Sequence, residues 1–177
     1  MKLIRRIVYS VILIAVALAV VGFLLPSAFS VKRSVVIKAD KEQVHELVGD
    51  LKQWPVWAPW TEIDPTIKTT YGEKTTGVGA HQSWKGDSGT GELTFTSADP
   101  DTGVLFDLSF EEGKYKSTGG LTYATAKEGG VEVSWTMQGD AGMNLINRYM
   151  GLLMDRMVGK DFERGLEKLK TKAEGKK

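Results

Sequence analysis

Residues 144–172, NLINRYMGLLMDRMVGKDFERGLEKLKTK, form the stretch that decides the fold of this chain. The stretch contains no proline, its charged residues recur every three or four positions, and apolar residues fill the gaps. This spacing is typical of one long amphipathic helix. Almost everything before it has the pattern of β-strands, so a single helix has to cover the sheet that these strands form.

Two apolar lines run along this predicted helix when its residues are placed about 100° apart. One line consists of Ile146, Met150, Leu153 and Met157, and the other, about 140° away, consists of Val158, Phe162, Leu166 and Leu169. We therefore expect the second half of the helix to pack on a sheet and the first half to lie beside a less rigidly packed surface. Four of the six methionines, Met143, Met150, Met154 and Met157, fall in that first half or directly before it, where flexible thioethers either form an adaptable wall or simply fill the core.

The chain has 177 residues, enough for one domain with a core of its own. It has no cysteine, which excludes disulfides, thiolate nucleophiles and cysteine-bound zinc. Outside the first thirty residues it carries 20 basic and 22 acidic side chains. A nearly neutral domain lacks the clustered Lys and Arg that bind phosphates, so we expect no nucleic-acid partner.

Residues 7–25 form an uncharged, predominantly apolar run. A helix of that length spans about 28 Å, close to the roughly 30 Å of a bilayer's hydrocarbon core. Lys2, Arg5 and Arg6 precede the run and favour a cytoplasmic N-terminus, although the basic residues that follow it weaken this preference. We therefore predict a single-pass membrane protein whose folded domain lies on the extracytoplasmic (periplasmic) side.

A cleavable signal peptide is the alternative for this segment, and the domain is then exported after signal cleavage. The sequence Ala28-Phe29-Ser30 resembles a small-residue cleavage site, yet the apolar run exceeds the roughly 7 to 15 residues of a usual signal peptide. Under either interpretation residues 1–29 are a membrane anchor or signal segment, and residues 30–177 are the folded domain.

The folded domain is expected to begin with a strand over residues 30–38 and a short helix after Asp40, which has the capping-box spacing to Gln43. Three tryptophans and two prolines then crowd into residues 54–60, so we expect a short turn there with Trp57 in the core. From residue 67 the pattern alternates, and strands are predicted over residues 67–71, 81–85, 92–97, 104–110, 121–127 and 131–138. Because short turns join these strands, we expect an antiparallel meander.

Alternation also predicts which side chains face the long helix. The sheet offers Trp84, Phe95, Phe106, Leu108, Phe110, Tyr123 and Trp135, and the Met-rich half of the helix offers Met150, Leu153 and Met154. A strongly curved sheet that holds a single helix leaves space between them, so these residues are our candidate lining of an internal ligand cavity. The same residues packed tightly would form an ordinary core.

The sequence contains no recognisable catalytic or metal-binding arrangement. Residues 86–89, Gly-Asp-Ser-Gly, look like the nucleophile turn of chymotrypsin-like proteases, but the chain has only two histidines and is too short for a double barrel. Neither His45 nor His81 has a partner histidine at ligand spacing. Glu92 and Asp107 are expected to point outward. We therefore predict no catalytic residues, no metal and no cofactor.

Several short motifs, in their order and spacing, resemble the polyketide cyclase/dehydrase branch of the START-like (SRPBCC) superfamily. They include residues 31–37 (VKRSVVI), 57–60 (WAPW), 133–135 (VSW) and 162–170 (FERGLEKLK). The resemblance extends from Ser30 to about Glu174. It implies an α+β helix-grip fold, in which a curved antiparallel sheet of about seven strands surrounds a long C-terminal helix with a deep hydrophobic cavity between them. Such families include cyclases, lipid carriers and hormone receptors, so the resemblance implies no single activity.

Three hypotheses about function follow. The first is a membrane-tethered domain, anchored through residues 7–25, that binds a lipid or other hydrophobic small molecule in the cavity. The second is a polyketide cyclase/dehydrase-like enzyme for an aromatic or polyketide-type substrate, with Tyr123 or Asp107 as acid or base. The third is a stress or scaffold protein with a filled core, whose sheet recruits a partner.

Overall fold

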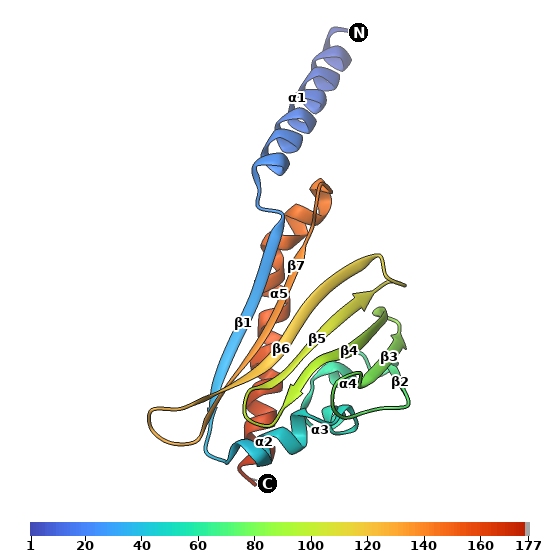
Figure 1. The fold of residues 1–177 in the computed structure, drawn as a ribbon. Coiled ribbons are helices and arrows are strands. Elements are labelled where there is room, and N and C mark those ends of the chain that lie inside the picture. Colours follow the sequence, from blue (N-terminus) through green and yellow to red (C-terminus); the bar gives the residue numbers. More distant parts are fainter. Residues whose placement is uncertain (176–177) are drawn as a thin grey trace.

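One seven-stranded antiparallel sheet and one long helix, α5, form the folded body (Figure 1). The computed structural model describes residues 1–175. In sheet order the strands are β1 (Ala28–Ile37), β7 (Val131–Asp140), β6 (Tyr115–Thr125), β5 (Gly103–Phe110), β4 (Gly89–Asp99), β3 (His81–Gly86) and β2 (Lys68–Tyr71). The predicted α+β helix-grip fold is confirmed.

The helices differ greatly in length. α1 (Lys2–Leu24) projects from the folded body, and α5 (Leu145–Ala173) runs beside the sheet (Figure 1). Between β1 and β2 lie α2 (Lys41–Val48), η1 (Leu51–Gln53), α3 (Trp54–Trp57) and α4 (Trp60–Ile63). Within residues 1–175, α1 is the one helix that is long and apolar enough to cross a membrane, a property that anchors and signal sequences share.

Side-chain caps fix where two of these helices begin. The Asp40 N–H donates to Gln43 Oε1 at 3.2 Å, which confirms the predicted capping box at α2. The Asn147 N–H donates to Asn144 Oδ1 at 3.1 Å and caps α5. Both bonds satisfy backbone donors that the first turn of a helix leaves without a partner.

The strands extend further than their sequence pattern predicts. β6 begins at Tyr115, although the polar residues 111–120 were expected to form a link. Ser117 nevertheless pairs with Leu108, because the backbone ladder needs a facing strand and not an apolar side chain. In the same way β1 begins at Ala28, opposite Asp140 on β7.

The second half of α5 packs on the sheet, as its second apolar line predicts. Phe162, Leu166 and Leu169 are buried, and the Phe162 ring stacks on Trp135 with centroids 4.2 Å apart and planes within 4°. Trp57 is fully buried, and its indole N–H donates to the Leu47 carbonyl at 2.9 Å. The aromatic core is therefore concentrated at the end of the sheet that meets the C-terminal half of α5.

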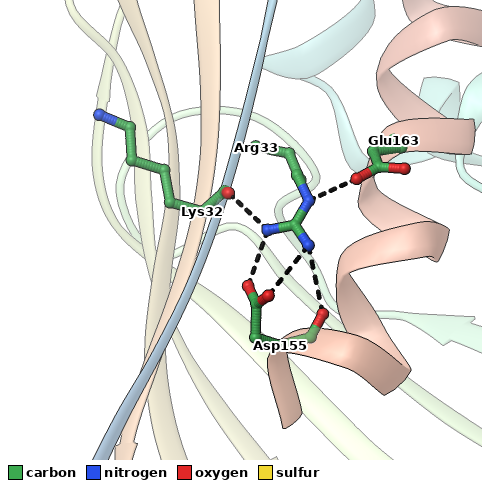
Figure 2. A network of polar contacts seen from close by, with 4 residues as sticks. All are labelled: Lys32, Arg33, Asp155 and Glu163. Carbon is green, nitrogen blue, oxygen red and sulfur yellow. Dashed lines mark hydrogen bonds and ion pairs between the residues drawn. The ribbon is translucent and has the colours of Figure 1, made fainter.

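α5 lies along the edge strand β1, and Arg33 fixes it there (Figure 2). Arg33 Nε donates to Glu163 Oε1 at 2.6 Å, Nη1 donates to Asp155 Oδ1 at 2.7 Å, and Nη1 also donates to the Lys32 carbonyl at 2.8 Å. The two carboxylates are about two turns apart on α5. Gly159 lies between them, and a Cβ at this position would overlap the guanidinium.

We predict that Gly165→Ala destabilises the fold, because an added Cβ would lie 2.7 Å from Trp135 Cζ3 and 3.1 Å from Pro59 Cδ. Overpacking of this kind lowers the free energy of unfolding by about 1–3 kcal/mol. The matched control is Gly151→Ala on the same helix, where the nearest atom, Phe29 Cβ, is 3.7 Å away. Helix propensity then leaves stability unchanged or raises it by up to about 1 kcal/mol. Urea unfolding of the full chain in detergent, followed by tryptophan fluorescence, measures both; equal stabilities would contradict the prediction.

Candidate functional site

An apolar hollow of about 780 Å³ lies between α5 and the inner face of β3, β4 and β5. It exists because α5 packs mainly along β1 and does not cover β3, β4 and β5. Residues of α3 and α4 form a third side. We call this space the inner hollow. Its main apolar lining residues are Trp54, Trp60, Trp84, Leu93, Phe106, Leu108, Phe110, Trp135, Met137, Met150, Met154 and Val158.

Ring contacts hold the aromatic wall of the inner hollow in place. Trp84 meets Phe110 edge to face with centroids 5.8 Å apart, and Trp60 meets Trp135 in the same way at 5.7 Å. Aromatic pairs prefer this geometry, and each ring in a pair limits the movement of the other. The wall on the sheet side is therefore rigid, whereas α5 contributes flexible methionines to the opposite wall.

The structure brings most of the predicted cavity residues together at this one place. Trp84, Phe106, Leu108, Phe110, Trp135, Met150 and Met154 all line the inner hollow.

The structure places the other three predicted cavity residues elsewhere. Phe95 is 1% exposed and packs against Trp54 in the closed core. Tyr123 is 8% exposed and lies beside His45 of α2. Leu153 is 48% exposed on the outer side of α5, because the contact with β1 turns this side of the helix away from the hollow.

The hollow is also lined by residues outside the predicted set, and two kinds of them matter for the site. Trp54 and Trp60 come from the tryptophan-rich segment, whose aromatic content is the signal that could have marked them. Gln82 on β3 is the other, and nothing in its sequence context marks it. Its side chain is only 7% exposed, lines the inner hollow, and makes no hydrogen bond to any other residue within the described part of the chain.

Charged groups stay at the rim of the inner hollow. Glu111, Lys114 and Lys116 line it from exposed positions. Asp140, also exposed, accepts a hydrogen bond from the Gly142 N–H at 2.7 Å, which lowers the pKa of its carboxyl. Asp161 is half-buried. The floor is accordingly apolar apart from Gln82.

The two side chains proposed as acid or base lie away from the inner hollow. Burial raises the pKa of Tyr123 and keeps its phenol protonated. Asp107 is exposed and lines a shallower, more polar depression of about 1030 Å³ with Glu92 and Gln138. Alternation places the Asp107 side chain on the opposite face of the sheet from Phe106. We place the candidate site in the inner hollow because it is more enclosed and more apolar.

No cluster of three or more His, Cys, Asp or Glu side chains that suits a metal ion occurs among residues 1–175. The apolar floor of the inner hollow also offers no ligand set of the kind that metals require. The chemistry that this site can perform with its own residues is the enclosure of apolar surface, with the side-chain amides of Gln82 and Asn147 available for hydrogen bonding.

The curved antiparallel sheet, the C-terminal helix and the space between them define the class of fold, which is the helix-grip fold. A family model described as "Polyketide cyclase / dehydrase and lipid transport" matches residues 28–174. The chain therefore belongs to this family, the branch of the SRPBCC superfamily that its sequence resembles. No curated protein matches the chain in sequence.

Solved structures share the fold at low sequence identity. SA2116 from Staphylococcus aureus, a protein of unknown function, is 14% identical with a TM-score of 0.61, and the match covers 84% of this chain and 94% of that one. A protein from Thermobifida fusca is 18% identical with a TM-score of 0.61, over 81% of this chain and 92% of that one. The di-domain ARO/CYC protein StfQ of the steffimycin biosynthetic pathway is 10% identical with a TM-score of 0.60, over 84% of this chain and 51% of that one. Likeness at these identities shows the fold alone.

We predict that acid weakens the fold through His45, whose Nδ1 lies 3.3 Å from the Tyr123 hydroxyl. Burial lowers the pKa of His45 below 6.5, although the charge of Asp99 opposes this. As the pH falls through about 6.5, the unfolded chain takes up a proton that folded His45 resists, so stability decreases.

The pH dependence of the urea midpoint between about pH 7.5 and pH 5.5 measures this effect. His45→Gln is expected to remove the His45 contribution, whereas the matched control His81→Gln keeps it. A His45→Gln curve with the wild-type slope would show that His45 does not cause the loss.

Proposed function

We propose that this chain is a membrane-tethered protein that binds a lipid or another hydrophobic small molecule in the inner hollow. The observation that carries the proposal is an apolar space of about 780 Å³ with its charged residues confined to the rim. Its volume falls within the roughly 300–1,000 Å³ of typical ligand pockets. The lipid-transport part of the family description agrees with this function.

Gln82 supplies the polar contact of the proposed site. No fully enclosed side-chain nitrogen or oxygen lacks a hydrogen-bond partner within residues 1–175, so the Gln82 amide stays accessible to water in the inner hollow. A ligand that places a hydroxyl, carbonyl or carboxyl group beside Gln82 would take the place of that water and keep the amide hydrogen-bonded. The ligand we propose is therefore amphiphilic, with an apolar body against the aromatic wall and one polar group at β3.

The proposed tether is α1, with the N-terminus in the cytoplasm and residues 30–177 as the domain on the extracytoplasmic side. Its basic start, Lys2, Arg5 and Arg6, supports this orientation. The pairing of Ala28 with Asp140 supports an uncleaved anchor, because removal of residues 28–30 would shorten β1. Phe29, the next residue, also lines the inner hollow.

Binding has stronger support than catalysis. A cyclase or dehydrase needs an acid or base within hydrogen-bond reach of its substrate. Tyr123 lies in the closed core, and Asp107 belongs to the opposite face of the sheet. The filled-core alternative has weaker support for a different reason, since the aromatic residues leave open the space that it requires to be closed.

Photo-crosslinking of the full chain in liposomes tests whether the inner hollow takes up an apolar ligand. With a diazirine fatty acid in the bilayer, we expect adducts on peptides from β3 to β5 as well as on α1. Met154→Trp fills the hollow and should reduce the β3–β5 adducts several-fold while leaving those on α1 unchanged. Wild-type adducts confined to α1 would refute ligand binding.

The matched control for this variant is Leu153→Trp, which adds the same side chain one position earlier on the outer side of α5. We expect it to retain the wild-type adduct pattern. Equal loss in both variants would mean that the indole disturbs α5 in general, and ligand uptake by the hollow would lose its support.

We predict that Gln82→Leu lowers the yield of β3–β5 adducts from the fatty acid roughly tenfold, the equivalent of about 1.4 kcal/mol. A diazirine hydrocarbon without a polar group should react with wild type and variant alike. Thr69→Val is the control, because it removes an exposed hydroxyl at the rim of the same hollow. An unchanged fatty-acid yield in Gln82→Leu would exclude Gln82 as the polar contact.

A further inference from the structure

α1 and α5 are held together by direct contacts and not only by the intervening chain. The Tyr149 hydroxyl donates to the Leu18 carbonyl at 2.7 Å. Arg148 Nη1 donates to the carbonyls of Phe23 and Leu25 at 2.9 Å and 3.1 Å, which serves acceptors that the end of α1 leaves open. Gly22 lies against the Tyr149 ring. The orientation of α1 is therefore coupled to that of α5.

These contacts set how deep the start of α5 lies when α1 spans a bilayer. Leu18 lies six residues before the end of α1 at Leu24, which is about 9 Å along the helix axis. The apolar run of residues 7–25 only just matches a hydrocarbon core of roughly 30 Å. The Leu18 carbonyl thus lies below the bilayer surface, and the Tyr149 hydroxyl lies at the same level.

The side chains at the start of α5 suit that depth. Its first apolar line, Ile146, Met150, Leu153 and Met157, is exposed, and Ile146 reaches 74% exposure. The folded body offers nothing to cover this line. Placed about 100° apart, the same residues lie between the side of α5 that touches α1 and the side that lines the inner hollow.

Two positively charged residues follow the exposed apolar line on α5. Arg156 and Lys160 are exposed, and the 100° spacing places them on the α1-facing side, about one and two turns beyond Leu152. α5 runs away from α1 towards the opposite end of the molecule (Figure 1). Along α5, exposed apolar side chains thus come first and these two cations follow. This order matches the change in a membrane from acyl chains to phosphate headgroups.

From this arrangement we infer that the first three turns of α5 are inserted in the interfacial layer of the membrane that α1 crosses. The inner hollow then opens onto the bilayer beside Met150 and Asn147, which both line it. Its ligand enters and leaves sideways from the lipid layer without passing through water. The inference rests on the proposed tether and adds a lipid bilayer as the surface on which α5 docks.

Single-cysteine labelling tests the docking, since the chain has no cysteine of its own. Ile146→Cys and Leu153→Cys carry an environment-sensitive fluorophore in the full chain, reconstituted in phosphatidylcholine vesicles with a minority of phosphatidylglycerol. Val16→Cys in α1 is the reference position for a label inside the bilayer. Val56→Cys in α3, an exposed apolar position near the far end of the molecule, is the reference position for a label in water. We expect spin-labelled lipid to quench positions 146 and 153 several-fold more than position 56.

The outcomes separate the docking from the proposed function. Iodide quenching at 146 and 153 equal to that at 56, with lipid quenching retained at 16, overturns the docking and leaves the tether in place. If iodide also quenches the label at position 16 as strongly as that at position 56, both the docking and the membrane tether are overturned. Lipid quenching at 146 and 153 without any β3–β5 adducts from the photoreactive fatty acid leaves the docking standing and refutes ligand binding.

A second variant tests whether the hollow opens onto the bilayer. Ile146→Glu combined with Leu153→Glu places two charges at exposed positions, so the fold should persist while the start of α5 leaves the lipid layer. We expect several-fold fewer β3–β5 adducts from a probe supplied in the bilayer. The control Ile146→Leu with Leu153→Ile should react like wild type, and equal yields from the glutamate variant would overturn lateral entry.

Discussion

The contact between α5 and the edge strand β1 is the constraint on which the rest of this structure depends. Arg33 bonds to carboxylates on two turns of the helix, and Gly159 leaves room for its guanidinium. The hydrogen bond from Arg33 lowers the pKa of Asp155, so this carboxylate stays charged at a lower pH than that of an isolated aspartate. A helix held at the edge of a curved sheet cannot also cover the strands at the other side, and because α3 closes only part of that side, space remains over β3, β4 and β5.

Side-chain size decides where along the sheet that space stays open. Towards the C-terminal half of α5, Trp57, Trp135 and Phe162 fill the interior and anchor the helix. Towards α1 the helix presents methionines and Gly151, which leave more room and adapt more readily. One end of the domain is therefore a closed core, and the other contains the inner hollow. The same division explains why the proposed ligand site and the proposed membrane contact share one half of α5.

α1 and the folded domain are joined by side-chain contacts as well as by the chain. Arg148 and Tyr149 donate hydrogen bonds to α1 carbonyls, so a change in the tilt of α1 would also move the start of α5 at the opening of the inner hollow. With α1 as the proposed anchor, this junction would set which side of the domain faces the lipid. Because the domain would already be oriented towards the bilayer, it would lose little rotational entropy when it binds its proposed ligand there.

The sequence by itself determined the elements: the apolar span of α1, the capped start at Asp40, the alternating strands and the long amphipathic α5, with family motifs that pointed to the helix-grip fold. Periodicity along the sequence also put seven of the ten expected cavity residues on faces that line one space in the structure. Only the tertiary structure decided how α5 is rotated, which turned Leu153 outward, and how deep the core reaches, which enclosed Phe95 and Tyr123. It also decided that Gln82 faces an apolar space. The reason is physical: periodicity assigns side chains to the faces of one element, whereas packing between distant elements decides what each face meets.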